Sequence, residues 1–411
     1  MADVPNRAED SNPDAKRPVL SLICCSRNDD YLGRATWRLQ TGLNLTARAV
    51  HELGLEDDVE IILTDWGSDE PLQKVLCLTD EAARLLRVLE VPKPVAERYQ
   101  RDAPFSEVHA LNAAARRSRG EYIGRIDQDT VLGRKFLQRF FELHRGERST
   151  GAPIHAVQML SNRRGVPYRF ASTQPPAWVV DRFIQRFGPR LPLAKPLPEH
   201  LYYQSYVGIW LIHRDLWFEI GGYDESFIYI NWMEADMILR LEPKYPFVNL
   251  GRLIDHDIYH LDHIHPFAHW GAKGRVRREN PVRDRDNPPA EVFPNGEDWG
   301  LANEDLRLTP YELKPGEAAR ARESVYRPAR ASYSGRLVLL AFRLVRDRAV
   351  LTSLSLATRL AKRVLSVAPG LEETVASYRN ALRGHPFRQW PGVLRDHRME
   401  RRARLVHRSS P

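Results

Sequence analysis

The sequence predicts an α/β fold built on a doubly wound, mostly parallel sheet flanked by helices. Three observations predict it: short apolar runs that suit strands buried on both faces, segments of helical periodicity between those runs, and polar clusters directly after them. Strands that alternate with helices are the pattern of such a sheet, which binds its ligands beyond the carboxyl ends of its strands. The polar clusters should therefore mark the site.

The first 130 residues supply most of this alternation. The expected strands are 18–25, 59–63, 87–91 and 121–126. The expected helices are 34–54, which Gly54 would terminate, a segment that begins at Leu72, and 107–117. The polar clusters that follow three of the strands are 26–30, 64–69 and 127–130.

The rest of the chain is less regular. Residues 151–200 are rich in Pro, Gly and Arg and give a poor periodic signal, so we expect a loop-rich elaboration there. A strand is expected at 206–212 and a helix at 231–241. The Pro- and Arg-rich stretches 281–290 and 314–330 are typical of linkers.

Basic charge is concentrated in the C-terminal tail. Residues 331–411 contain 16 of the 61 Lys and Arg residues and 5 of the 53 Asp and Glu residues, so the net charge of +8 is not spread over the chain as a nucleic-acid-binding surface would require. Binding of nucleic acid is therefore disfavoured. Residues 335–366 alternate apolar and basic residues at helical spacing, which suits either an amphipathic helix on an anionic membrane surface or a helix packed on protein.

The cysteines and the N-terminus favour a cytoplasmic location. Three cysteines, with Cys24 and Cys25 adjacent in an apolar run, cannot form a disulfide framework. Residues 1–17 are polar, lack the apolar stretch of a signal peptide and are expected to be disordered. The protein would be peripheral at the inner membrane face if its tail binds lipid.

Asp127 and Asp129 are the first candidates for chemistry. Two carboxylates separated by one residue can share a hard divalent cation, which also commonly holds substrate phosphates. Alone, Asp-x-Asp is more typical of a solvated turn. Its position after the fourth strand, in line with two earlier polar clusters, favours a metal and nucleotide-diphosphate site.

Four segments in order resemble the GT-A fold glycosyltransferases, and among them the inverting, metal-dependent, family 2-like enzymes. These segments are LICCSRNDD (22–30), TDWGSD (64–69), EVHALNAAARRSRGEYIGRIDQDT (107–130), and GGYDESF followed by WMEADMILRL (221–241). The resemblance covers about residues 18–300. It implies a GT-A, Rossmann-like domain over 18–310, with a nucleotide-binding half at 18–135 and an acceptor and metal half at 200–300, before a basic helical region at 331–411.

The resemblance also implies an activity. A sugar would pass from a nucleotide-diphosphate donor, with UDP-sugars as the first guess, to a hydroxyl of a glycan, lipid-linked or small-molecule acceptor, as in polysaccharide biosynthesis. The cofactor would be Mn²⁺ or Mg²⁺, with Asp129 as a direct ligand. The residues implied in nucleotide-sugar binding are Asp29, Asp65, Asn112, Arg125 and Asp127, of which Asp65 would lie by the base and Asp127 by the ribose or metal.

The proton of the attacking hydroxyl requires a carboxylate as general base. Aligned with the family's acceptor helix, Glu234 takes the position of the base. Met233 stands where the family has a first acid, and Glu234 where it has Asp, so Asp236 is the alternative base. Residues two apart on a helix do not share a face, so we expect one of the two to act.

Residues 255–270 contain five of the fourteen histidines and three aspartates, a density that suggests metal binding. The resemblance implies that one histidine after the acceptor helix completes the metal shell, with His263 as the first candidate and His260 as the second. Trp299 lies in a segment, 295–301, that resembles a loop folded over the donor in some of these enzymes. A place in the core is the other expectation for Trp299.

Two other functions stay open. The first is a non-catalytic nucleotide-sugar-binding module that has kept the fold and lost the base. The second is a metallohydrolase built on the His and Asp residues of 255–269, although no His-Glu-x-x-His or comparable ligand motif is present.

Overall fold

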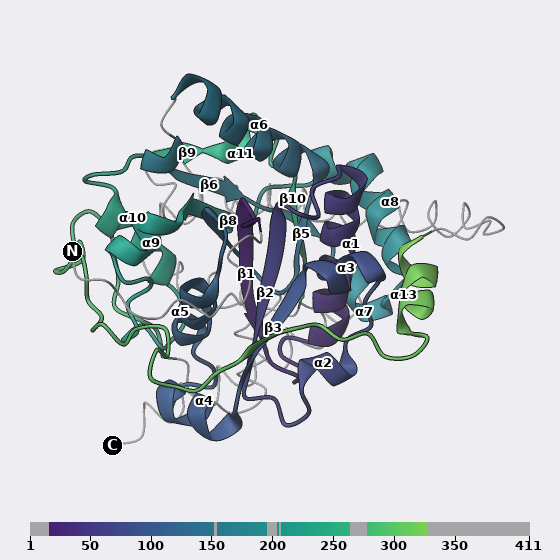
Figure 1. Ribbon diagram of the computed structural model, residues 1–411, viewed down its shortest axis with the longest axis horizontal. Helices are drawn as coiled ribbons and strands as arrows, with labels where there is room; N and C mark the ends of the chain where they lie inside the picture. The colour runs from purple at the N-terminus through teal and green to yellow at the C-terminus, as the bar shows by residue number, and fades with distance from the viewer. Residues whose placement is uncertain (1–15, 152–153, 195–203, 205–206, 264–277, 327–411) are drawn as a thin grey trace, which may run out of the picture. The chain divides into compact units, whose positions relative to one another are not determined.

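The structure is a computed structural model that describes residues 16–151, 154–194, 204, 207–263 and 278–326. These residues belong to one compact unit. Its centre is an eight-stranded sheet in the order β11-β3-β2-β1-β4-β8-β6-β9 (Figure 1). The strands of this sheet are β1 (Leu20–Ser26), β2 (Val59–Trp66), β3 (Leu86–Val91), β4 (Tyr122–Ile126), β6 (Gln158–Asn162), β8 (Val207–His213), β9 (Phe247–Asn249) and β11 (Leu308–Pro310).

The sheet is mostly parallel. β1 pairs with β2 and with β4 in parallel, and β2 pairs with β3 in the same sense. β8 is antiparallel to β4 and β6, β9 is parallel to β6, and β11 is antiparallel to β3 at the edge. The predicted α/β class, with a mostly parallel sheet flanked by helices, is confirmed.

Helices cover both faces because the strands are apolar on both sides. In β1, Leu22 and Cys24 belong to the core cluster that includes Leu43 of α1 (Ala35–Glu52), whereas Ile23 belongs to the cluster that includes Leu111 of α5 (Glu107–Arg117). Figure 1 shows α1 and α3 (Asp80–Leu85) on one side of the sheet, and α5, α9 (Arg214–Glu219) and α10 (Met233–Leu241) on the other.

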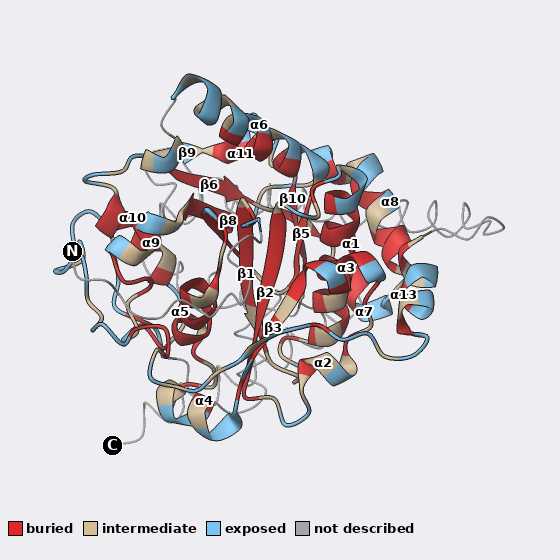
Figure 2. Cartoon of the chain, viewed as in Figure 1, coloured by how far each residue is buried: buried red, intermediate tan, exposed pale blue. Residues whose placement is uncertain are grey.

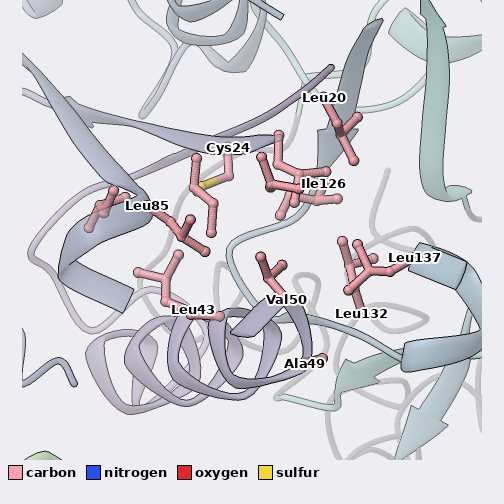
Figure 3. Close-up of a cluster of buried hydrophobic side chains, with 14 of the residues drawn as sticks. Leu20, Cys24, Leu43, Ala49, Val50, Leu85, Ile126, Leu132 and Leu137 are labelled. Carbon is pink, nitrogen blue, oxygen red and sulfur yellow. The ribbon is translucent and has the colours of Figure 1, made fainter. Parts of the chain in front are cut away.

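Burial follows this layering. Figure 2 shows that the central strands and the helix faces turned toward them are buried, while the outer helix faces are exposed. Figure 3 shows part of the first core cluster, in which Leu43 and Val50 of α1 point toward Cys24 and Ile126 of the sheet. Burial of each such side chain stabilises the fold by about 1.5–3 kcal/mol.

The remaining helices lie around this core. They are α2 (Leu72–Val75), α4 (Lys93–Gln100), α6 (Arg134–Thr150), α7 (Arg169–Thr173), α8 (Ala177–Phe187), α11 (Leu250–Leu253) and α13 (Glu317–Val325), with short 3₁₀ turns at Ile154–Ala156 and Gly188–Arg190. Across the described residues, no helix is both long and apolar enough to span a bilayer.

A second, three-stranded sheet lies beside the first and positions the site. Its order is β5-β10-β7, from strands β5 (Thr130–Leu132), β10 (Ile258–Leu261) and β7 (Arg164–Val166). β10 is antiparallel to β5 and parallel to β7. This sheet therefore joins the residues directly after Asp129 to the histidine-rich segment, about 130 positions later in the sequence.

The loop-rich interpretation of residues 151–200 was wrong. This region contributes β6 to the central sheet, together with β7, α7 and α8. β6 has the sequence QMLSN and is buried along its whole length. Because three of its five residues are polar, the sequence pattern did not indicate a buried strand. Gln158 is fully buried, and its amide donates to the carbonyls of Ile238 (3.2 Å) and Tyr245 (2.9 Å), which compensates its burial.

The prediction of a linker at 314–330 was also wrong for residues 314–326, the part that the structure describes. α13 occupies most of it and begins at Glu317, whose carboxylate is fully buried. That carboxylate accepts hydrogen bonds from Leu78 N (2.7 Å) and the Tyr311 hydroxyl (2.7 Å) and pairs with Lys314 Nζ (2.8 Å). Residues 308–326 are thus part of the domain. The expected tail helix at 335–366 lies outside the described residues, as does the whole of 331–411.

Candidate active site

The polar loops after β1, β2 and β4 meet at one edge of the sheet, as expected for parallel strands. The Ser26 hydroxyl donates to the side-chain carbonyl of Gln128, which joins the first loop to the Asp-Gln-Asp segment. The backbone N–H of Asn28 donates to Ser68 Oγ over 2.8 Å, which joins the first loop to the second. Segments from three parts of the sequence therefore form one surface.

Asp129, His260 and His263 form a cluster at this edge. His260 lies opposite Thr130 in the β5–β10 pair, and the Leu261 N–H donates to the Asp129 carbonyl over 3.0 Å. This pairing places His260 Nε2 3.0 Å from Asp129 Oδ1 and His263 Nε2 3.5 Å from Asp129 Oδ2. One ligand atom from each residue lies within 4.8 Å of the others, which is close enough to hold a metal ion.

The Asp129 carboxylate is buried and electrostatically poised for a cation. Burial alone would raise the pKa of the Asp129 carboxyl, but His260 and then Arg38 outweigh it, so this pKa lies well below its usual range. Oδ1 is buried and accepts no well-aligned hydrogen bond, although His260 Nε2 is near. His260 is oriented in turn by Asp262, whose Oδ1 lies 3.2 Å from Nδ1. A buried carboxylate next to two imidazoles, one of them oriented by a second carboxylate, fits a metal centre.

Asp127 does not share this cluster. Its carboxylate pairs with Arg125 Nη2 over 2.7 Å and with Arg163 Nη1. The two aspartates of the segment are therefore separated: Asp129 faces the histidines, and Asp127 faces two arginines. The sequence-based assignment of Asp127 to the ribose or metal remains a prediction.

Arg125 organises several carboxylates at the same edge. Its side chain is 5% exposed, and its Nη2 lies 2.5 Å from Glu107, 2.7 Å from Asp127 and 3.0 Å from Glu234. Burial would lower the pKa of Arg125, but Glu234 and Glu107 raise it, so the guanidinium stays charged. Arg125 thus holds Glu234 in place; its direct contact with a nucleotide sugar remains a prediction.

Glu234 and Asp236 differ sharply in their surroundings. The Glu234 side chain is 23% exposed at the start of α10. Asp236 is 2% exposed and paired with two arginines, Arg240 Nε at 2.9 Å and Arg283 Nε at 2.9 Å. Arg240 also donates to the carbonyls of residues 220 and 222, so Asp236 belongs to a buried structural network.

The two aspartates expected near the base lie in the first two loops. Asp29 pairs with Arg27 (2.7 Å) and accepts from the Tyr31 N–H (2.9 Å), with 35% of its side chain exposed. Asp65 is almost fully buried and accepts hydrogen bonds from Ser68 Oγ and from the backbone N–H of residue 72. Burial raises the pKa of Asp65, against those hydrogen bonds. Both residues shape loops at the predicted nucleotide site.

Asn112 is buried and supports the neighbouring Gly-Gly turn. It is fully buried, and its amide nitrogen donates to the Tyr223 carbonyl (2.8 Å) and to Glu225 (3.0 Å). Its Oδ1 accepts from the Tyr223 N–H over 2.8 Å. The left-handed Gly222 (φ 74°) packs so closely that a Cβ there would collide with this amide. The expected contact of Asn112 with a nucleotide sugar remains a prediction.

Other residues of the histidine-rich segment have separate roles. Asp257 caps α6, since its Oδ2 accepts from the Lys135 N–H over 2.9 Å, and it also accepts from the Tyr259 hydroxyl. Asp255 lies 54% exposed near Lys135 and Arg164. Residues 265 and 269 lie outside the described residues. Trp299, 4% exposed, packs in the core against Phe218, which agrees with the second of its two expectations.

Sequence reasoning missed two arginines. Arg38 of α1 is fully buried, and its Nη1 donates to Asp129. Arg163 pairs with Asp127 and comes from the region interpreted as loops. A signal for Arg38 was present: α1 is buried on nearly all sides, so its polar residues had to have partners inside the protein.

Comparisons with known proteins find likenesses in structure alone. No protein-family model and no curated protein matches the chain. Among solved structures, the chain is similar to S. aureus TarS 1-349 (13% identity, TM-score 0.36, 57% of this chain and 61% of that one). It is also similar to the mannosyltransferase PcManGT from Pyrobaculum calidifontis in complex with GDP-Man and Mn²⁺ (13% identity, TM-score 0.37, 86% and 88%). The chain thus spans about three fifths of the TarS structure. The case for a reaction rests on this chain's own residues.

Proposed function

We propose that the protein is a glycosyltransferase that transfers a sugar from a nucleotide-diphosphate donor to an acceptor hydroxyl by an inverting single displacement. One observation carries the proposal: Asp129 of the Asp129–His260–His263 cluster is two residues from Asp127, and Asp127 shares the Arg125 guanidinium with the partly exposed Glu234. A cation site beside a partly exposed carboxylate is what this reaction requires.

The donor atoms of the cluster favour Mn²⁺ over Mg²⁺. Asp129 offers one oxygen, and His260 and His263 offer two nitrogens. Mg²⁺ prefers an all-oxygen shell, whereas imidazoles suit first-row transition metals. When bound, the cation would stabilise the charge that develops on the departing diphosphate.

Glu234 is the proposed general base. It is partly exposed and is positioned by one ion pair with Arg125, so an acceptor hydroxyl can approach it. Asp236 has both oxygens engaged by arginines and is buried, which leaves no path for a substrate. The Glu234 carboxylate therefore accepts the proton of the acceptor hydroxyl as that hydroxyl attacks the anomeric carbon. The sugar–phosphate bond breaks on the opposite side of that carbon.

The first two loops are proposed to hold the nucleotide. Asp29 retains exposed carboxylate surface, and Asp65 fixes the loop that contacts the Asn28 backbone through Ser68. The sequence resemblance supports the proposed acceptor class and the preference for UDP-sugars. The basic amphipathic pattern of the 331–411 tail supports a contact with a membrane.

A nucleotide screen tests the proposal. Nucleoside diphosphates and their sugars are each added with and without Mn²⁺ while the Tm is recorded, because a ligand that binds only the folded state raises the Tm. We expect one nucleoside diphosphate and its nucleotide sugars to raise the Tm only when Mn²⁺ is present. We also expect slow hydrolysis of one of these nucleotide sugars. Binding without turnover would indicate a non-catalytic module. Mn²⁺-dependent hydrolysis of a substrate that contains no nucleotide would indicate a metallohydrolase.

A further inference from the structure

One guanidinium connects the metal carboxylate to the loop after β1. Arg38 is completely buried in α1. Its Nη1 donates to Asp129 Oδ2, its Nη2 donates to the Tyr31 carbonyl (2.6 Å), and its Nε donates to the Gly33 carbonyl (3.1 Å). All three nitrogens are therefore used, and two of them hold backbone.

The loop that Arg38 holds has an unfavourable backbone. Leu32 (φ 57°), Gly33 (φ 82°) and Arg34 (φ 57°) all adopt left-handed conformations, and two of these are not glycine. Such conformations persist only where surrounding contacts fix them. Asp29 and Asp30 supply local contacts through the N–H groups of Tyr31 and Arg34, and Arg38 supplies the contacts that tie the loop to the site.

The packing of α1 brings Arg38 to Asp129. Gly42, one turn further along the helix, lies so close to the β4–β5 turn that a Cβ on it would be 2.5 Å from the Thr130 carbonyl oxygen. The close approach lets a side chain one turn earlier reach Asp129. Arg38 takes Oδ2, which also lies 3.5 Å from His263 Nε2, and leaves Oδ1 facing His260 Nε2 at 3.0 Å.

We propose that Arg38 is a positioning residue that serves as the internal counter-ion of the metal carboxylate and fastens the 31–34 loop to it. The proposal rests on the metal site of the proposed function. An imidazole must be neutral to bind metal, whereas a guanidinium stays charged at every physiological pH, so only Arg38 offers Asp129 a positive charge that does not depend on the state of the histidines. Arg38 supplies it, and thereby keeps the site assembled whenever the cation is absent.

A double-mutant cycle on metal-free protein tests the counter-ion. Arg38→Met leaves the buried Asp129 carboxylate without its guanidinium partner and should lower the Tm by about 6–15 °C. The loss in the double variant Arg38→Met/Asp129→Asn should be smaller than the sum of the two single losses by about 5 °C. Additive losses would overturn the counter-ion role. Because no metal is present, this result is independent of whether the protein transfers sugar.

A metal titration with a matched control completes the test. Mn²⁺ should raise the Tm of Arg38→Met about twice as far as it raises that of the wild type, since the cation replaces the missing charge. Arg48→Met is the control: it removes a largely buried arginine of the same helix that pairs with Asp181 instead of the site. Its Mn²⁺ shift should equal the wild-type shift. An equal shift in all three proteins would refute the proposal, and no shift in any would refute the metal site itself.

Arg38→Lys separates the two roles and covers the case in which Arg38→Met does not fold. Lysine keeps the charge but cannot reach Asp129 and both carbonyls together. We expect a Mn²⁺ shift close to that of the wild type, together with faster amide hydrogen exchange in residues 31–34. Unchanged exchange in that loop would contradict the fastening role.

Discussion

Replacement of Glu234 by Gln and of Asp236 by Asn should separate chemistry from folding. Asp236 is 2% exposed and pairs with Arg240 and Arg283, so its neutralisation leaves two arginines in or near the core without their charged partner. Loss of one partner from a buried ion pair costs about 3–5 kcal/mol, which corresponds to a fall in Tm of about 6–15 °C. Asp236→Asn should therefore be a stability variant.

Glu234→Gln should be a chemical variant. The Glu234 side chain is 23% exposed, and its partner Arg125 keeps Glu107 and Asp127, so the loss of stability should stay below about 1 kcal/mol. Removal of a general base typically lowers the rate by about 10²–10⁴-fold. Donor affinity should stay within about twofold, because the base acts on the acceptor.

The assay combines thermal denaturation with release of nucleoside diphosphate from the donor found in the screen. We expect Glu234→Gln to fold normally with little turnover, and the folded fraction of Asp236→Asn to turn over normally at low temperature. If Glu234→Gln kept the wild-type rate and Asp236→Asn folded normally but lost turnover, the base would be Asp236 and the reasoning from burial would be refuted.

Three further predictions concern stability. Burial, with a contribution from Arg101, lowers the pKa of His109 to about 4, below its usual 6.5, so the contribution of this residue to stability is complete above pH 6.5 and is lost progressively as the pH falls from 6.5 to about 4. The loss should reach about 2 kcal/mol at pH 5 in urea unfolding, and His109→Gln should lack this pH dependence. Glu317→Ala removes four interactions from a fully buried carboxylate and should cost about 2–4 kcal/mol in the same assay, whereas a change below 0.5 kcal/mol, on the order of a surface substitution, would contradict the anchoring role of α13. Gly42→Ala should lower the free energy of unfolding by about 1–3 kcal/mol, and with it the Tm, because the new Cβ meets the Thr130 carbonyl, despite the better helix propensity of alanine; a higher Tm would show that α1 shifts without cost.

The parallel half of the sheet was predictable because local pattern and tertiary environment agree there. β1 and β2 are buried on both faces, so each is centred on an apolar run, and the helix between them ends at Glu52, with the left-handed Gly54 after its C-cap as expected. The predicted meeting of the three polar loops followed from the parallel arrangement alone. It is confirmed by the contacts of Ser26 with Gln128 and of Asn28 with Ser68.

The parts that sequence reasoning missed depend on distant partners. Sequence reasoning missed β6 because Gln158, Ser161 and Asn162 are buried polar residues, and the local pattern does not reveal the long-range hydrogen bonds that compensate the burial of Gln158. The preference for His263 over His260 could not be decided from spacing, because the β5–β10 register places both next to Asp129.

The roles of Arg38 and Asn112 were hidden for the same reason. A polar residue in a helix pattern does not reveal whether it faces a ligand or a buried neighbour. Asn112 stands in a segment that resembles a binding motif, yet its amide is used by the turn at Tyr223. Arg38 stands in no motif, yet it contacts the metal carboxylate.

We propose that Asp129 holds a cation that the reaction requires, so turnover should depend on both Mn²⁺ and this carboxylate. Release of nucleoside diphosphate from the nucleotide sugar selected by the screen is followed against Mn²⁺ concentration for the wild type, Asp129→Asn and Asp255→Asn. Asp255 is the matched control, because it is a carboxylate of the same histidine-rich segment that lies outside the cluster. We expect saturable, Mn²⁺-dependent release by the wild type and by Asp255→Asn, and a loss of about 10²-fold or more in Asp129→Asn. Equal release by all three proteins, or release independent of Mn²⁺, would contradict it.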